Sequence, residues 1–499
     1  MNKQEALDFY KEYREKCNAY NLALATIHFD MSTIAPKQGN EYATKMISIL
    51  SGELFDYSTN QDNMNKLYEM KEMDLGQVMN KEIRTVLKDL EKTSKLPREF
   101  YMKMQSTFAY GQVIWLKAKE NADYSMFKDT LKEIVELTKE AYTYYGGEGT
   151  LYDRMLNEFE TGMTIEKYEE FFKIIKDRLV PFVHKVVEKQ DYIDDSIFHE
   201  HYSREKQIEV MDILKEYMGF DETECYLGES EHPFTTELSP YDVRITTKYL
   251  EDNLVSAIFS IIHEFGHATY ALHVDDSLKG LVIGDEMTSG IHESQSRFME
   301  NYMGRRKSFW VNNYPKVQEI FPDQLKDVSL DEFIRMINVA KPTLVRTEAD
   351  ELTYPLHILI RYELEKEMIN GEVDYDTLNK VWNDKYEEYL GIRPSNDKEG
   401  ILQDIHWSSG DIGYFPTYAL GSAFGAQFLK AMKKDLDVDK LLENNEFDKI
   451  KEWLREHIHK YGALYDSQEI IKMCTGEAFD PNIYVDYLID KYSKLYDIK

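Results

Sequence analysis

The chain has 499 residues, of which 42% are hydrophobic and 30% charged, a balance typical of a globular protein in water. Its formal net charge of −31 repels phosphate backbones and anionic lipid surfaces, so we expect neither nucleic acid nor a membrane as a partner. Few residues are glycine (24) or proline (12), which argues against a loop-rich all-β protein and favours helices.

Amphipathic helices are predicted for most of the first 225 residues. Apolar side chains recur there at helical spacing, and charged side chains occupy the outer faces. The first helix starts at residue 4 and leads into a break at Pro36 and Gly39, and a glycine cluster at 146–149 is the clearest later break. The remaining predicted helices cover residues 41–57, 61–75, 78–94, 97–121, 123–145 and 164–189, the last with an internal Pro181.

Residues 226–252 have a different composition. Prolines at 233 and 240 separate runs of β-branched residues that include Thr235 and Thr246. This pattern predicts a short β-hairpin directly before the next helix.

The following segment, 254–270, predicts a buried helix with a single polar stripe. Apolar side chains cover most of its circumference, but His263 and His267 lie one turn apart on one face, with Glu264 beside the first. Buried neutral histidines and a carboxylate need partners, and a divalent metal with its bound water would supply them. The alternative is a pair of core histidines that are satisfied by other protein groups.

A helix that begins near Ser289 carries Glu293, at a workable distance for a third metal ligand. On that helix His292 points about 100° away from Glu293, so both cannot face one ion. Two histidines and a glutamate leave one zinc position open, which is typical of a catalytic site. Glu264 would then act as the general base in hydrolysis of a peptide bond.

The rest of the chain is again mainly helical. The spacing of Ser329 and Glu332 predicts a capping box, and 346–365 predicts a helix or helix pair that is interrupted at Pro355. Residues 374–390 predict another helix. The segment 391–417 has loop character, and ordinary helices are predicted beyond Ala419.

Seven consecutive motifs make the chain resemble the carboxypeptidase Taq family of metallocarboxypeptidases over nearly its whole length. They are HPF at 232–234, DVRIT at 242–246, HEFGH at 263–267, HESQSR at 292–297, VRTEAD at 345–350, GILQDIHW at 400–407 and GYFPTYALG at 413–421. Outside the predicted site, DRMLNEFETGMT at 153–164 and TGEAFDP at 475–481 are also similar to the family.

The resemblance implies an all-α fold like that of neurolysin and angiotensin-converting enzyme, with a deep central groove and the small hairpin near the active site. It implies Zn²⁺, or Co²⁺ as a substitute, held by His263, His267 and Glu293, with Glu264 as general base. It also implies release of single C-terminal residues from peptides, by a homodimer. Within a single 1–499 peptidase domain, we expect an N-terminal lobe (1–225) that forms a groove wall or cap, a catalytic core (226–430) and C-terminal helices (431–499).

Other site residues are candidates. Arg346 is the first choice for the substrate's terminal carboxylate, since a guanidinium group matches it bidentately. Arg244 and Arg361 are alternatives, and each arginine could instead form a buried structural ion pair. Tyr418, Tyr414 and His232 are candidates to stabilise the oxyanion, although either tyrosine could simply pack. Asp242, Gln403, Asp404 and His406 complete the set as groups that line or orient the site.

Two other functions stay open: an endo-oligopeptidase on the same scaffold, and a metal-free helical binding protein with an inactive motif. The three cysteines lie far apart and imply no disulfide framework. No secretion signal is evident at the N-terminus, and no apolar run approaches about 18 residues, so a cytoplasmic location is expected.

Overall fold

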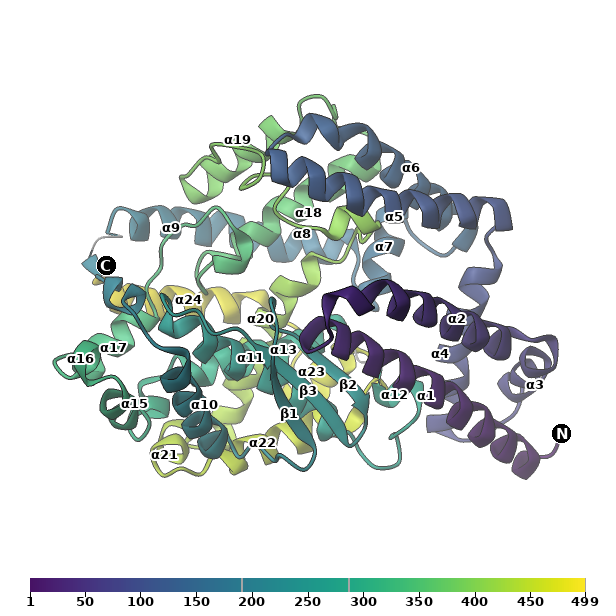
Figure 1. The fold of residues 1–499 in the computed structure, drawn as a ribbon, viewed down its shortest axis with the longest axis horizontal. Coiled ribbons are helices and arrows are strands. Elements are labelled where there is room, and N and C mark those ends of the chain that lie inside the picture. The colour runs from purple at the N-terminus through teal and green to yellow at the C-terminus, as the bar shows by residue number, and fades with distance from the viewer. Residues whose placement is uncertain (190–191, 286–287, 499) are drawn as a thin grey trace.

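Helices make up most of the computed structural model, as the low glycine and proline content predicts (Figure 1). The structure describes residues 1–189, 192–285 and 288–498. The helices of the N-terminal part are α1 (Lys3–Thr33), α2 (Asn40–Thr59), α3 (Gln61–Lys71), α4 (Gln77–Ser94), α5 (Arg98–Asn121), α6 (Lys128–Tyr145), α7 (Leu151–Phe159), α8 (Ile165–Ile174), α9 (Val180–Val187) and α10 (Arg204–Met218).

The sheet before α11 has three strands, β1 (Cys225–Glu229), β2 (Thr235–Ser239) and β3 (Asp242–Thr247). The predicted hairpin is present as the antiparallel pair β2 and β3. The third strand, β1, pairs in parallel with β3 in the order β1-β3-β2. A local pattern cannot reveal β1, because its partner is not its sequence neighbour.

The remaining helices follow the sheet in the chain. They are α11 (Leu254–Leu272), α12 (Val282–Asp285), α13 (Ser289–Arg297), α14 (Lys307–Trp310), α15 (Tyr314–Ile320), α16 (Pro322–Leu325), α17 (Leu330–Ile337), α18 (Tyr354–Asn370), α19 (Leu378–Leu390), α20 (Pro416–Asp435), α21 (Val438–Glu443), α22 (Phe447–His457), α23 (Ser467–Thr475) and α24 (Pro481–Tyr496). The predicted capping box of α17 is present: Ser329 accepts from the Glu332 N–H and the Glu332 side chain accepts in return.

One predicted helix is shorter than expected. The segment 346–365 begins with a single turn at Arg346–Glu348, and α18 starts only at Tyr354. Pro355 therefore lies in the first turn of α18 and does not interrupt a helix, because a proline there removes an N–H that has no partner inside the helix. Arg346 lies outside the helix as a result.

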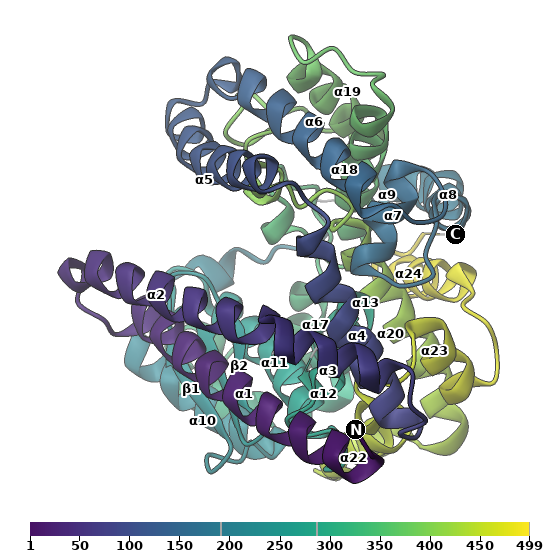
Figure 2. The ribbon, with the colours of Figure 1, turned by 90° about the vertical axis from the view of Figure 1, so that its right-hand side faces the viewer.

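Two of the four clusters of buried side chains in the described ranges account for most of the packing. Helices α1, α3 and α4 share a small cluster that includes Tyr10, Leu67 and Leu87. A much larger cluster runs from Ala118 to Tyr496 and contains the whole buried side of α11. Figure 2 shows α5, α6 and α19 at one end of the molecule and α1, α2 and the sheet at the other. Within the described ranges, no helix is long and apolar enough to cross a membrane.

Candidate metal centre

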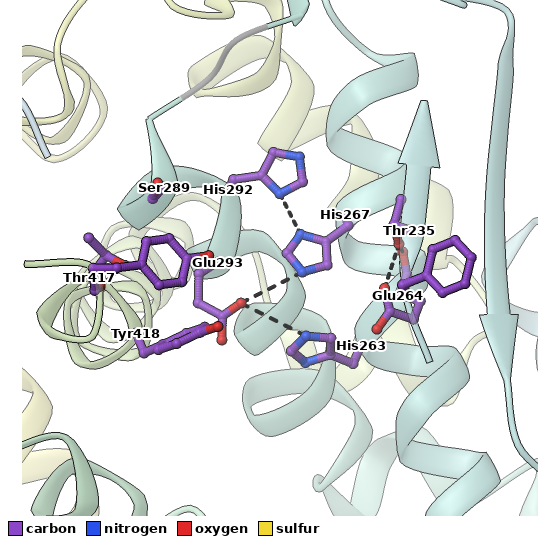
Figure 3. A pocket seen from close by; sticks show the side chains of 11 residues that line it. Thr235, His263, Glu264, His267, Ser289, His292, Glu293, Thr417 and Tyr418 are labelled. Atoms are coloured by element: carbon purple, nitrogen blue, oxygen red, sulfur yellow. Dashed lines mark hydrogen bonds and ion pairs between the residues drawn. The ribbon is translucent and has the colours of Figure 1, made fainter. Parts of the chain in front are cut away.

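Helix α11 carries the two predicted histidine ligands. It begins after Asn253, whose side chain accepts a hydrogen bond from the Ser256 N–H. Most of its apolar side chains are buried, whereas His263 and His267 are only partly buried and face a common space (Figure 3). The sequence pattern of one polar stripe on a buried helix is thus what the structure has.

Helix α13 lies between α11 and α20, and glycines allow this close approach. A Cβ atom at Gly266 would lie 2.4 Å from the Gln295 carbonyl oxygen, and one at Gly421 would lie 2.5 Å from Cγ of Glu293. Larger residues at these positions would push α13 away. The glycine inside the HEFGH motif and the last glycine of GYFPTYALG therefore help to place Glu293 opposite the histidines.

The three predicted ligands converge. Nε2 of His267 lies 3.6 Å and Nε2 of His263 lies 3.9 Å from Oε2 of Glu293. These ligand atoms all lie within 4.8 Å of one another. Ligands about 2.0–2.1 Å from a tetrahedral zinc would be about 3.4 Å apart, so a small inward movement would close the set around one ion.

Neighbouring side chains fix which atoms of the ligands point inward. Nδ1 of His263 donates to Oε2 of Glu300 over 2.9 Å, and Nδ1 of His267 shares a hydrogen bond with Nδ1 of His292. Each ring thereby presents Nε2 to Glu293. Burial lowers the pKa of His267 well below its usual value, so the ring stays neutral, as a metal-binding imidazole must be.

Glu300 is a supporting residue that the sequence interpretation missed. It lies seven residues beyond Glu293, in a π-helical segment (Phe298–Gly304) that continues α13. Arg297 donates to both carboxylates, at 2.7 Å to Glu293 and 3.1 Å to Glu300. Burial alone would raise the pKa of Glu300, but Arg297 and His263 hold it well below its usual range. Its position two turns after a proposed ligand is the signal that could have identified it.

Replacement of Glu300 by Gln should weaken metal binding by about 10–100-fold, as is typical when the hydrogen-bond partner of a metal-bound histidine is changed. The amide keeps the size of the side chain but removes the charge that orients His263. Competition of the apo-protein with a chromogenic chelator measures the affinity. An unchanged dissociation constant would contradict this role of Glu300.

Glu264 lies on the same side of the site as the strands. Its Oε2 accepts a 2.5 Å hydrogen bond from Oγ1 of Thr235 in β2. Burial raises the pKa of Glu264 above its usual value, against the opposing effects of His263 and of the Thr235 hydrogen bond. The carboxylate is therefore held in one orientation and has an increased tendency to accept a proton.

The three proposed ligands and Glu264 line a cavity of about 390 Å³. The sequence interpretation expected Tyr414 and Tyr418 near the site, and both line the cavity. Burial raises the pKa of both phenols, so they keep their protons and can donate hydrogen bonds. The lining residues are Phe234, Thr235, His263, Glu264, His267, Ser289, His292, Glu293, Tyr414, Thr417 and Tyr418. Phe234, Thr235, Ser289 and Thr417 lacked a separate signal in the sequence.

Arg346 lies behind the cavity wall. Its guanidinium carbon is 4.8 Å from the centre of the Tyr418 ring, which lines the cavity. Nε and one terminal nitrogen donate to Oδ1 of Asp404 at 3.1 and 3.0 Å, and the other terminal nitrogen donates to the Tyr354 hydroxyl at 3.1 Å. Three of its five N–H groups are thus engaged, so the guanidinium group keeps donors for a further anion.

Arg361 is placed differently. It is fully buried, and all five of its N–H groups have acceptors within the protein. These acceptors are Oδ2 of Asp404 (twice), Gln403 Oε1, the His357 carbonyl oxygen and the Tyr386 hydroxyl. Its geometry is that of the structural ion pair considered as the alternative, and we do not propose it as a substrate ligand.

A network of hydrogen bonds behind the cavity wall involves Gln403, Asp404 and His406. Besides its bond to Arg361, Gln403 accepts from the Arg346 N–H at 2.8 Å. Arg361 and Arg346 hold the pKa of Asp404 well below its usual range in spite of burial. Nε2 of His406 lies 3.4 Å from the Tyr418 hydroxyl oxygen. Burial lowers the pKa of His406 to about 4, so the ring is neutral. These residues connect Arg346 and Tyr418, and none of the three lines the cavity.

Three further candidates lie outside the cavity lining. Arg244 pairs with Asp242 on β3 through two hydrogen bonds of 2.9 and 2.8 Å, and its guanidinium carbon lies 5.1 Å from the centre of the Phe29 ring. His232 is exposed to solvent. Its segment is held instead by Thr246, whose Oγ1 accepts from the Phe234 N–H at 2.9 Å. The HPF and DVRIT motifs are therefore in contact with each other through Thr246.

Comparisons with known proteins agree along the whole chain. A family described as carboxypeptidase Taq (M32) metallopeptidase matches residues 9–492. Carboxypeptidase 1 of Bacillus subtilis (strain 168) is 41% identical over 97% of each chain, and thermostable carboxypeptidase 1 of Pyrococcus furiosus is 36% identical over 94% of this chain and 95% of its own. The crystal structure of M32 carboxypeptidase from Deinococcus radiodurans R1 is similar with a TM-score of 0.95 at 30% identity, covering 99% of this chain and 100% of that one.

Proposed function

The chain belongs to the carboxypeptidase Taq (M32) metallopeptidases and is a metallocarboxypeptidase, and from this premise we propose that zinc bound by His263, His267 and Glu293 serves its active site. The observation that carries the proposal is the convergence of both Nε2 atoms on the Glu293 carboxylate, with Glu264 in the same cavity. This donor set suits zinc and accepts cobalt.

Glu264 is the proposed general base. When bound, the metal supplies Lewis acidity to a water molecule and to the peptide carbonyl. Glu264 accepts the proton of that water and passes it to the leaving amine. Thr235 donates a hydrogen bond to Oε2 of Glu264 and so orients the carboxylate. Burial raises the pKa of Glu264, which makes the carboxylate a stronger proton acceptor. The base is thus both oriented and tuned by its surroundings.

Tyr418 and Tyr414 are the proposed donors to the oxygen that becomes negatively charged. Both line the cavity with Glu293 and keep their protons, because burial raises the pKa of each phenol. A donor placed in advance stabilises developing charge without reorganisation. His232 is less suited in this conformation because it is exposed and lies outside the lining.

Arg346 is proposed to bind the terminal carboxylate of the peptide. Asp404 and Tyr354 hold its guanidinium group beside Tyr418. A carboxylate that reaches this group from the cavity would complete its set of acceptors, and the bidentate geometry of arginine suits it. A site for the terminal carboxylate is what release of C-terminal residues requires, because it selects the free end of the peptide.

A peptide with a free C-terminus should be hydrolysed about 10²-fold or more faster than the same peptide with a C-terminal amide, because the amide cannot pair with Arg346. Steady-state kcat/KM values, with mass spectrometry of the products, measure the ratio. The Arg346→Gln variant should lose most of this discrimination. Arg244→Gln is the matched control, since Arg244 pairs with Asp242 of its own strand, whereas Arg346 packs against Tyr418 of the cavity lining.

Equal turnover of the two peptides by the unaltered enzyme would reject the carboxylate site altogether. Loss of the discrimination in Arg244→Gln but not in Arg346→Gln would transfer the role to Arg244.

Other features of the proposal depend on the family. We propose a homodimer and a cytoplasmic location. The location is supported by the three cysteines, which are all free in the structure. We also propose that 226–430 acts as the catalytic core between the N-terminal lobe (1–225) and the C-terminal helices (431–499).

A further inference from the structure

We propose that Glu160, together with Ser467, is a positioning residue that holds the N-terminus of α13 and thereby places Glu293 opposite the two histidines. This inference rests on the proposed metal site. It concerns the segment 153–164, which resembles the family but contains none of the proposed ligands or catalytic groups.

Glu160 follows the last residue of α7 and is completely buried. Its Oε2 accepts a hydrogen bond of 2.7 Å from the backbone N–H of Gly290. Its Oε1 accepts from the hydroxyl of Ser467, the first residue of α23. One carboxyl group therefore links three segments that are far apart in the sequence.

The contact with Gly290 is at the first turn of α13, where backbone N–H groups have no acceptor inside the helix. Glu293 is three residues further on, about one turn from the contact. A Cβ atom at position 290 would lie 2.5 Å from Oε2 of Glu160, so only glycine permits the carboxyl group to reach the backbone. The contact therefore needs both the buried carboxyl group of Glu160 and a glycine at position 290.

The other contacts of α13 restrain it sideways. Gly266 of α11 and Gly421 of α20 bring their helices against its two sides. Glu160 acts at the end of the helix, along its axis. Since metal ligands must be placed to within about 0.2 Å, a small axial shift of α13 would separate Glu293 from the histidines.

The surroundings of Glu160 show that it acts through hydrogen bonds and not through an ion pair. Burial raises the pKa of Glu160 to about 8, the Gly290 hydrogen bond opposes this, and the nearby charge of Asp466 adds to it. Ion pairs of Glu160 with lysine or arginine are absent from the described part of the chain. The group thus acts through hydrogen bonds. In Glu160→Gln the amide oxygen can still accept from the Gly290 N–H, and the amide nitrogen can donate to the Ser467 hydroxyl, which then acts as acceptor.

The test compares Glu160→Ala with Glu160→Gln. In Glu160→Ala, the dissociation constant of the apo-protein for Zn²⁺, measured by chelator competition, should rise by about 10–100-fold. In Glu160→Gln it should stay within about threefold of the unaltered value. Thermal unfolding of each apo-protein, measured in parallel, reports the general loss of stability.

Glu82→Ala is the matched control. Glu82 is also fully buried, and it accepts from the N–H groups of Val282 and Ile283 at 2.9 and 3.0 Å. It thus holds the start of α12, a helix without a proposed ligand. We expect Glu82→Ala to unfold at a lower temperature but to bind Zn²⁺ with unchanged affinity.

Unchanged Zn²⁺ affinity in Glu160→Ala, or an equal loss in Glu82→Ala, would overturn the inference. If Glu160→Ala does not fold, Ser467→Ala removes half of the link and should weaken Zn²⁺ binding to a smaller extent, and unchanged affinity there would overturn the inference as well. Failure of the unaltered protein to bind Zn²⁺ would instead reject the proposed metal site.

Discussion

Replacement of Glu264 by Gln should lower kcat by about 10²–10⁴-fold while the protein keeps its metal. The amide can still accept the hydrogen bond from Thr235, so the side chain keeps its position. It cannot accept the proton of the attacking water. Steady-state kinetics on a peptide with a free C-terminus, together with metal analysis of the same preparation, measure the two effects separately.

The pH profile provides a second readout of Glu264. Burial raises the pKa of this carboxyl group above the usual value of 4.5. A general base must be ionised, so kcat/KM should fall as the pH decreases through this raised pKa, and the fall should begin above pH 4.5. The residual activity of Glu264→Gln should lack this limb.

Thr235→Val is a useful companion to Glu264→Gln, because it removes the hydrogen bond that lowers the pKa of Glu264 and keeps the shape of the side chain. Its acidic limb should shift to higher pH. Full activity of Glu264→Gln with bound metal would contradict the role of Glu264 as the base.

Replacement of Glu293 by Ala should remove the metal almost completely. The affinity loss should exceed the about 10–100-fold expected for Glu300→Gln, because a direct ligand and its charge are removed. Activity should fall with metal content. Dialysis against a chelator followed by metal analysis checks the first point, and titration with excess Zn²⁺ or Co²⁺ tests whether activity returns.

We expect the Glu293→Ala protein to stay folded, so that a loss of metal reports on the missing ligand. Arg297 loses one partner but still donates to Glu300 and lies 4.3 Å from the centre of the Tyr354 ring. The unfolding temperature of apo Glu293→Ala should therefore stay close to that of the unaltered apo-protein. Retention of stoichiometric metal after dialysis would eliminate Glu293 as a ligand.

Much of the fold could be predicted from local patterns. The buried helix with one polar stripe is α11, and the β-branched residues before it form the β2–β3 hairpin. Both follow from periodicity, which depends only on neighbouring residues. The strand β1 was missed because parallel pairing joins segments that are not adjacent in sequence. The turn at Arg346 was missed because a proline in a helical pattern is compatible with either an interruption or a start.

The sequence by itself predicted the candidate ligands of the centre: two histidines and a glutamate at suitable spacing, with a second glutamate beside them. Only the tertiary structure decided how each group is held. Glu300 and His292 orient the two histidine rings, and Asp404 pairs with both Arg346 and Arg361. Glu160, just after α7, accepts from the Gly290 N–H. These contacts join residues that are far apart along the chain, and their strength depends on burial. Helix spacing encodes which side chains share a face, but not which other segment packs against them.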